Sequence, residues 1–167
     1  MMSAAAPLHF RKMNGLGNDF VVFDARSAPV AMTEARARAI ADRRSGIGCD
    51  QLIVIEPSKR ADVTMRIWNN EGGEVESCGN ASRCIADLIF KEKKTTRATI
   101  DTKGGFLVAE KAGDALVTID NGAPRFDWKD IPLSEKFHDT RHIELQVGPV
   151  EAPLIHSPSV VNVGNPH

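Results

Sequence analysis

The most informative segment of the sequence is Cys78-Gly79-Asn80-Ala81-Ser82-Arg83-Cys84, together with the residues that follow it as far as Phe90. Apolar side chains recur there at the spacing of one helical face, and two more widen that face: Ala81, Cys84, Ile85, Leu88 and Ile89, then Ala86 and Phe90. An apolar face this wide has to be covered on several sides. The sequence therefore predicts a helix that begins near Cys78 and is enclosed by other elements.

The thiol of Cys78 stands where that helix is expected to begin. The free N–H groups of a first helical turn point out of the helix, and the partial positive charge there favours a thiolate over a thiol. The same charge attracts a carboxylate. A reactive sulfur and an anchor for an anionic ligand are therefore expected at one place.

Short strands account for most of the remaining chain. They are expected at His9–Met13, Phe20–Asp24, Leu52–Glu56, Val63–Trp68, Glu74–Glu76, Arg97–Thr102, Phe106–Lys111, Ala115–Asp120, His142–Val147 and Ser159–Val163. A second helix is expected from Glu34 to Arg44, capped by Thr33 and ended by Gly46. Helices and strands do not alternate strictly, which predicts an α+β fold with a mixed or largely antiparallel sheet curled around the Cys78 helix.

A break in the pattern at Asn121-Gly122-Ala123-Pro124 marks the expected domain boundary. Residues 1–122 form the predicted amino-terminal domain, which carries Cys78. Residues 123–167 are expected to be a linker and the first strands of a second domain. The chain is long enough for one domain plus part of another.

Composition limits the classes of function. The net charge is -1 and no basic stripe is present, so a nucleic-acid partner is not expected. Met1–Pro7 lacks a basic stretch before an apolar one, and no apolar run is long enough to span a bilayer. A cytoplasmic protein without membrane association is therefore expected, and the sequence leaves a homodimer open.

Three cysteines are too few for a disulfide scaffold and lack zinc-site spacing, so free thiols are expected. Cys84 fits the apolar helical face and is expected in the core, whereas Cys49 could pack or line a site. Asp19, Asp24 and Asp50 have no histidine near them and no ligand spacing, so no metal is indicated. Arg83 is interpreted as either a solvated cation or a member of a structural ion pair.

Two glycine pairs and several amides remain as candidate site features. Gly15-Leu16-Gly17 and Gly46-Ile47-Gly48 lack the third glycine of a dinucleotide fingerprint and are read as turn glycines. Uncharged amides at the ends of elements can offer donors and acceptors to a zwitterion, although each alone could be a turn residue or a cap: Asn18, Gln51, Asn69 and Asn80.

Five motifs in register closely resemble those of diaminopimelate epimerases. They are Met13-Asn14-Gly15-Leu16-Gly17-Asn18-Asp19-Phe20, Gly46-Ile47-Gly48-Cys49-Asp50-Gln51, Trp68-Asn69-Asn70-Glu71-Gly72, Cys78-Gly79-Asn80 and Gly164-Asn165-Pro166-His167. The resemblance runs from about Leu8 to His167. It implies a two-domain, pseudo-symmetric α+β fold in which each sheet wraps a central helix, with no cofactor, neither pyridoxal phosphate nor metal.

The resemblance also implies inversion at the α-carbon of LL-diaminopimelate, which gives the meso isomer, a precursor of lysine and peptidoglycan. One thiolate removes the α-proton and a thiol on the opposite face returns one. Cys78 is the implied catalytic cysteine of this half, and His167 resembles a residue that assists the cysteine pair. The Gly79 and Asn80 amides would hold the α-carboxylate, and further substrate contacts are implied at Asn18, Gln51, Asn69 and Asn165.

Two departures from the family pattern stand out. Ala81-Ser82 replaces the usual second glycine, which is expected to place a methyl group beside the carboxylate pocket. The partner cysteine of the second domain is not reached before His167, so the chain is expected to hold half an active site and to be inactive alone.

Three other readings remain open. The first is an enzyme resembling proline racemases and hydroxyproline epimerases, although that group typically has histidine where this chain has Asn80. The second is a noncatalytic small-molecule binding module, which has no need of an activated Cys78. The third is a nucleotide-binding domain.

Overall fold

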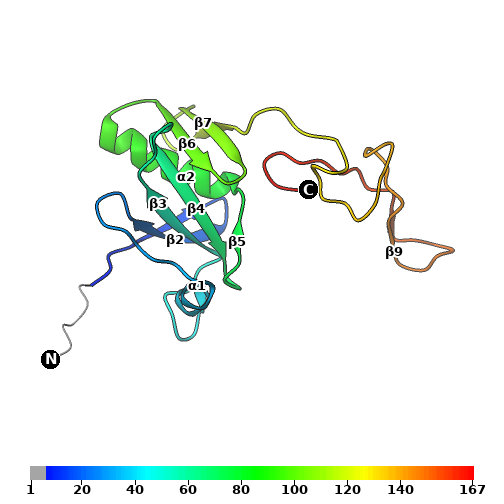
Figure 1. Cartoon of the computed structure of the whole chain (residues 1–167), viewed down its shortest axis with the longest axis horizontal. Helices are drawn as coiled ribbons and strands as arrows, with labels where there is room; N and C mark the ends of the chain where they lie inside the picture. The colour runs from blue at the N-terminus through cyan, green and yellow to red at the C-terminus, as the bar shows by residue number, and fades with distance from the viewer. Residues whose placement is uncertain (1–6) are drawn as a thin grey trace. The chain divides into compact units, whose positions relative to one another are not determined.

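The structure, a computed structural model, describes residues 7–167 (Figure 1). Its contacts divide the chain into two units, one extending to Asp120 and the other spanning Asn121–His167. The expectation about a signal in Met1–Pro7 falls, except for Pro7, outside the described residues. Among the described helices, none combines the length and apolar character needed to cross a bilayer.

The first unit is built on one mixed sheet. Its strands are β1 (Arg11–Gly15), β2 (Asn18–Asp24), β3 (Gln51–Glu56), β4 (Val63–Asn69), β5 (Glu74–Val75), β6 (Arg97–Thr102), β7 (Gly105–Lys111) and β8 (Val117–Asp120). They lie in the order β1-β2-β3-β4-β6-β7-β8, and β5 also pairs with β4. The pairs β2–β3 and β4–β6 are parallel, and every other pair in this sheet is antiparallel.

Helix α2 (Gly79–Lys93) packs against this sheet through the apolar face that the sequence predicts. Its buried residues are Ala81, Ser82, Cys84, Ile85, Ala86, Ile89 and Phe90. Leu88 is only half-buried, and the buried Ser82 satisfies its hydroxyl by donating to the carbonyl oxygen of Cys78 at 2.9 Å. The helix ends at Lys94, which adopts a left-handed conformation with φ 53°. The expected α+β fold, with a curled mixed sheet around a central helix, is confirmed.

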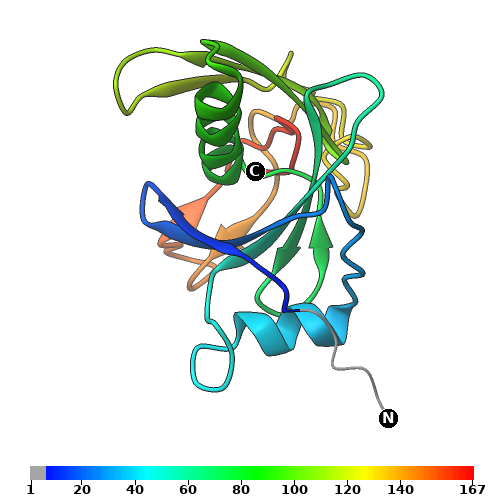
Figure 2. The same ribbon diagram turned by 90° about the vertical axis from the view of Figure 1, so that its left-hand side faces the viewer.

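The two faces of the sheet bury different side chains, as the strand period of two requires. On β2, Phe20 and Val22 join the core around α2, whereas Val21 and Phe23 join a second cluster. That second cluster includes residues of α1 (Glu34–Ala41), which lies on the other side of the sheet (Figure 2). Strands buried on both faces explain the unbroken apolar runs in β2 and β3.

The first hairpin is tighter than the sequence indicates. The predicted strands stop at Met13 and resume at Phe20, but β1 and β2 extend beyond these limits and leave a turn of Leu16 and Gly17. Both turn residues have positive φ, 53° and 93°, which is the geometry favoured in two-residue hairpins. The expected strand from His9 is wrong at its start, because β1 begins at Arg11.

Helix α1 is shorter than expected. Thr33 caps it as predicted, accepting the Arg36 N–H at 3.3 Å, but the helix ends at Ala41 rather than Arg44. The carboxylate of Asp42 accepts the backbone N–H groups of Arg44 and Ser45, at 2.8 and 2.6 Å. This local turn competes with the helix, so Gly46 is not its terminator.

The second unit has little regular structure. The expected strands at His142–Val147 and Ser159–Val163 are largely wrong: the hairpin consists of β9 (Gln146–Val147) and β10 (Ile155–His156). Asn162 forms only isolated bridges, with Arg125 and Pro166. Alternating apolar residues do not make a strand without a sheet to pair with. That this unit begins a second domain remains a prediction.

Candidate active site

Sheet topology brings three of the predicted contact residues to one end of the sheet. Asn18 opens β2, Gln51 opens β3 and Asn69 closes β4. Because β2 and β3 are parallel while β4 is antiparallel to β3, these three strand ends coincide. The register places Gln51 opposite both Phe20 and Asn69. Residues far apart in the sequence therefore share one edge.

The first turn of α2 reaches the same edge through a close approach at Gly15. A Cβ atom at Gly15 would lie 2.9 Å from the carbonyl oxygen of Asn80 and 3.1 Å from the sulfur of Cys84. Only glycine lets the hairpin and the helix come this close. Gly15 was predicted as a turn residue, and it lies beside the turn. It is also needed for the close contact between the hairpin and α2.

Cys78 is the N-cap residue of α2 and is half-buried. Its backbone is extended, and its sulfur accepts the N–H of Ala81 at 3.5 Å. A side-chain acceptor at this position satisfies one of the N–H groups that a helix start leaves unpaired. The sulfur therefore lies at the positive end of a 15-residue helix.

Asn18 and Asn80 form a hydrogen-bonded pair across 62 residues of sequence. Asn80 Nδ2 donates to Asn18 Oδ1 at 2.6 Å, and Asn80 Oδ1 accepts from the guanidinium of Arg83 at 2.7 Å. Arg83 therefore contacts an amide of the site, which neither reading of it from the sequence anticipated.

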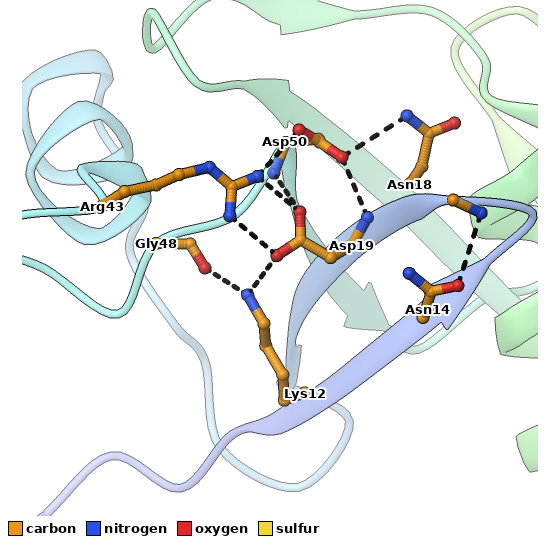
Figure 3. A network of polar contacts seen from close by, with 8 residues as sticks. Lys12, Asn14, Asn18, Asp19, Arg43, Gly48 and Asp50 are labelled. Carbon is orange, nitrogen blue, oxygen red and sulfur yellow. Dashed lines mark hydrogen bonds and ion pairs between the residues drawn. The ribbon is translucent and has the colours of Figure 1, made fainter.

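An ionic cluster made of Lys12, Asp19, Arg43 and Asp50 adjoins Asn18 (Figure 3). The N–H of Asp50 donates to Asp19 Oδ1 and the N–H of Asp19 donates to Asp50 Oδ2, both at 3.0 Å. Asp50 Oδ2 also accepts from Asn18 Nδ2 at 3.5 Å. Hydrogen bonds from Arg43, and then from Lys12, hold the pKa of Asp19 well below its ordinary value.

The other two cysteines are buried. Cys84 belongs to the core around α2, as predicted, and burial, with smaller contributions from Asp87 and Cys78, raises the pKa of its thiol to about 11. Cys49 packs in the cluster on the α1 side, and burial raises the pKa of its thiol as well. All three cysteines are free thiols.

Ala81 does not behave as expected. Its side chain is fully buried in the core around α2, so its methyl group packs inward instead of lining a ligand pocket. The replacement of glycine by alanine at this position therefore affects packing in the first place.

Asn69 serves the turn that follows β4. Its side-chain Oδ1 accepts the backbone N–H groups of Glu71 and Gly73, at 3.1 and 2.8 Å. The half-buried Gln51 lies beside it in the register. Substrate contacts by either residue remain predictions.

Asn165 and His167 belong to the second unit, where they contact each other. A ring nitrogen of His167 lies 3.1 Å from Asn165 Oδ1, and its backbone pairs with Val161. Buried Asn162 organises this segment, since its side chain bonds to Arg125, Asp130 and Gly164. The predicted roles of Asn165 and His167 remain predictions.

A cavity of about 360 Å³ lies beside α2 within the first unit, and Cys78 is not among the residues that line it. Its walls come from the β1–β2 turn, one side of α2 and the β7–β8 turn, including Leu16, Arg83, Cys84 and Leu116. Within residues 7–167, no three His, Cys, Asp or Glu side chains are grouped so that they could hold a metal ion.

The ionic cluster beside Asn18 was not predicted from the sequence, although Asp19, Arg43 and Asp50 belong to it. Asp19 and Asp50 were considered only as metal ligands. A usable signal was present, because each directly adjoins a predicted contact residue, in Asn18-Asp19 and in Asp50-Gln51. Arg43 offered no comparable signal, since the early end of α1 is what brings it to the carboxylates.

Comparison with known proteins assigns the chain to a family. The family model described as diaminopimelate epimerase matches residues 10–126. The chain belongs to the diaminopimelate epimerase family. Among its relatives, the diaminopimelate epimerase of Phenylobacterium zucineum is 50% identical over 99% of this chain, and that of Sphingopyxis alaskensis is 57% identical over 95%.

These matches cover 59% and 54% of the two relatives, so the chain spans little more than half the length of the family members that it matches. Solved structures share its fold. A methylitaconate-delta-isomerase superimposes with a TM-score of 0.55 at 20% identity, covering 95% of this chain and 51% of its own. A hydroxyproline epimerase from Agrobacterium vitis gives 0.53 at 15% identity, covering 84% and 44%.

Proposed function

We propose that this chain supplies the Cys78 half of a cofactor-independent epimerase that converts LL-diaminopimelate to its meso isomer in the cytoplasm, for lysine and peptidoglycan synthesis. One observation carries the proposal. The sulfur of Cys78 caps α2, Asn80 in the first turn of this helix bonds to Asn18, and Asn18 lies with Gln51 and Asn69 at one end of the sheet. The Cys78 sulfur as a base, a helix start that can bind an anion and side-chain amide donors are thereby found in one part of the first unit.

The chemistry follows from this geometry. A thiolate takes the α-proton, and the C–H electron pair passes into the adjacent carboxylate, which gains enolate character. The N–H groups of the first turn of α2, at Gly79 and Asn80, would stabilise that developing negative charge. A thiol on the opposite face then gives a proton to the α-carbon, which inverts its configuration, and the two sulfurs exchange protonation states.

The second sulfur has to come from outside this chain. Cys49 and Cys84 are both buried, and burial raises the pKa of each thiol. Neither is suited to exchange protons with a ligand at neutral pH. On this proposal Asn165 contacts the substrate and His167 assists the cysteine pair once the remainder of the enzyme is present.

The test is exchange at the α-carbon in deuterated water, followed by mass spectrometry. The 167-residue chain alone should show none with LL- or meso-diaminopimelate. A chimera should exchange, in which the chain is continued by the carboxyl-terminal part of the Phenylobacterium zucineum relative beyond the match. Cys78→Ala should abolish exchange in that chimera. Robust exchange by the chain alone would contradict the two-thiol mechanism.

The same chimera separates two of the other readings. A folded chimera that exchanges hydroxyproline or proline but not diaminopimelate would favour a proline racemase-like enzyme. A chimera that binds diaminopimelate without exchange would favour a noncatalytic binding module.

A further inference from the structure

We infer that Asp50 and Arg83 are positioning residues that orient the carboxamides of Asn18 and Asn80, so that both amides present N–H donors to a bound carboxylate. The inference rests on the proposed function for the identity of the ligand. It rests on the hydrogen bonds of this chain for the orientation itself.

The chain of hydrogen bonds has a donor at one end. The guanidinium of Arg83 can only donate, so Asn80 must turn its Oδ1 toward Arg83, at 2.7 Å. Asn80 Nδ2 then faces Asn18 and donates to its Oδ1 at 2.6 Å. Arg83 thereby fixes which way both amides point.

The other end is an acceptor. An ionised carboxylate can only accept, so Asn18 must direct its Nδ2 toward Asp50, at 3.5 Å. Asp50 Oδ2 is held in place by the Asp19 N–H at 3.0 Å, and Asp50 Oδ1 is held by Arg43 at 2.9 Å. The 3.5 Å contact is long, so its contribution is the direction that it imposes more than its own energy.

The positive charge of Arg83 at one end and the negative charge of Asp50 at the other therefore allow one orientation for both amides in this series of hydrogen bonds. Each amide has used its carbonyl oxygen to accept and one N–H to donate. Each therefore retains a second Nδ2–H. The groups left for a ligand beside the first turn of α2 are donors, which suit the carboxylate of an amino acid better than its ammonium group.

Asp50→Asn tests the orientation in the 167-residue chain itself. Asparagine keeps the size of aspartate but can donate as well as accept, so Asn18 is free to flip. Side-chain amide signals of Asn18 and Asn80 in ¹⁵N NMR should both move or broaden, although Asn80 does not contact Asp50 in the chain of bonds. The matched control is Asp101→Asn, which removes a β6 carboxylate that pairs with Arg60. It should leave both signals in place.

Arg83→Gln releases the opposite end without touching the ionic cluster. It should perturb the same two amide signals, which provides a second route if Asp50→Asn lowers stability. Backbone amide spectra report whether each variant is folded. Unchanged Asn80 signals in folded Asp50→Asn, or unchanged Asn18 signals in folded Arg83→Gln, would overturn the inference.

The kinetic arm uses the chimera. Asp50→Asn should raise KM for diaminopimelate about tenfold, the equivalent of one hydrogen bond of about 1.4 kcal/mol, with a smaller change in kcat. Asp101→Asn should change neither. A kcat loss with unchanged KM would contradict a role in holding the carboxylate. A chimera inactive on diaminopimelate in every form would remove the proposed function, whereas the NMR experiment would still decide the orientation.

Discussion

The three thiols of this chain differ in environment although their side chains are chemically identical. Cys78 is half-buried at the start of α2, whereas Cys49 and Cys84 are only 1% and 6% exposed. Alkylation requires both access and the thiolate form. Residue by residue, the structure therefore makes one sulfur available and protects the other two.

Iodoacetamide should accordingly modify Cys78 first in the native chain. Burial raises the pKa of Cys49 and Cys84, so both should react only after unfolding. Peptide mapping by mass spectrometry after a short reaction at pH 7.5 measures the order, and the same reaction in urea is the control. Native modification of Cys84 before Cys78 would show that the core around α2 opens more readily than its packing indicates.

Replacement by alanine should destabilise the fold at one glycine, Gly15, but not at another, Gly79. Gly15→Ala places a Cβ atom 2.9 Å from the backbone oxygen of Asn80, and we expect a loss of about 1–3 kcal/mol in the free energy of unfolding. Gly79→Ala meets nothing nearer than Arg83 at 3.9 Å, and it should be neutral or raise stability by up to about 1 kcal/mol, because alanine favours a helix. Urea denaturation followed by circular dichroism compares the two, and equal losses would contradict the close approach at Gly15.

Among the elements, β2 and β3 are joined near their starts by reciprocal bonds between Asp19, in β2, and Asp50, which directly precedes β3. This junction is charged, since Lys12 and Arg43 both pair with Asp19. The pairing depends on an ionised carboxylate at Asp19. The stability of this edge of the sheet should therefore depend on pH.

Asp19→Asn should reveal that dependence. The folded-state pKa of Asp19 is depressed below its ordinary value of 3.8, so its contribution is present above that pH and is lost as the pH falls toward the folded-state pKa. The variant should be less stable than the native chain by about 1–2 kcal/mol at pH 7, and the difference should shrink by pH 2.5. Urea unfolding at pH 7, 4 and 2.5 measures it, and a difference independent of pH would contradict the ionic origin.

At the scale of the whole molecule, the apolar core is unevenly distributed along the chain. Both core clusters and the residues packed against them lie between Met13 and Ile119. The unit Asn121–His167 contributes isolated buried residues, Ile131 and Ile143 among them, and exposes Val147, Leu154 and Ile155. The main cooperative unfolding transition should therefore belong to the first unit.

Truncation after Asp120 tests this division. We expect the removed residues to contribute no more than about 1 kcal/mol to the stability of the first unit. A change of that size shifts the midpoint of a domain this size by about 5 °C, so the shortened chain should keep a cooperative thermal transition within about 5 °C of the 167-residue chain. Differential scanning calorimetry measures the midpoint. Loss of cooperativity in the truncated chain would show that residues after Asp120 are part of the folding unit.

Local sequence signals predicted most of the helices and strands of the first unit. Strand propensity, alternation and helical spacing located β2, β3, β4, β6, β7, β8 and α2 to within a few residues, and Thr33 marked the start of α1. The errors came where one local preference competes with another, as in the Asp42 turn, or where a strand needs a partner, as in Ser159–Val163. Propensity does not contain the identity of the neighbouring strand.

The α+β class, the enclosed helix, the cysteine at its start and the family could all be predicted from the amino-acid sequence, because each depends on residue types at fixed spacing. Three contacts became known from the folded structure alone: the bond between Asn18 and Asn80, the bonds of Arg83 and Asp50 at the two ends of that pair, and the inward packing of Ala81. These contacts join segments separated by up to 62 residues or depend on which helical face turns toward the sheet. Strand order and the close approach at Gly15 create them, and neither is encoded in the spacing of neighbours along the chain.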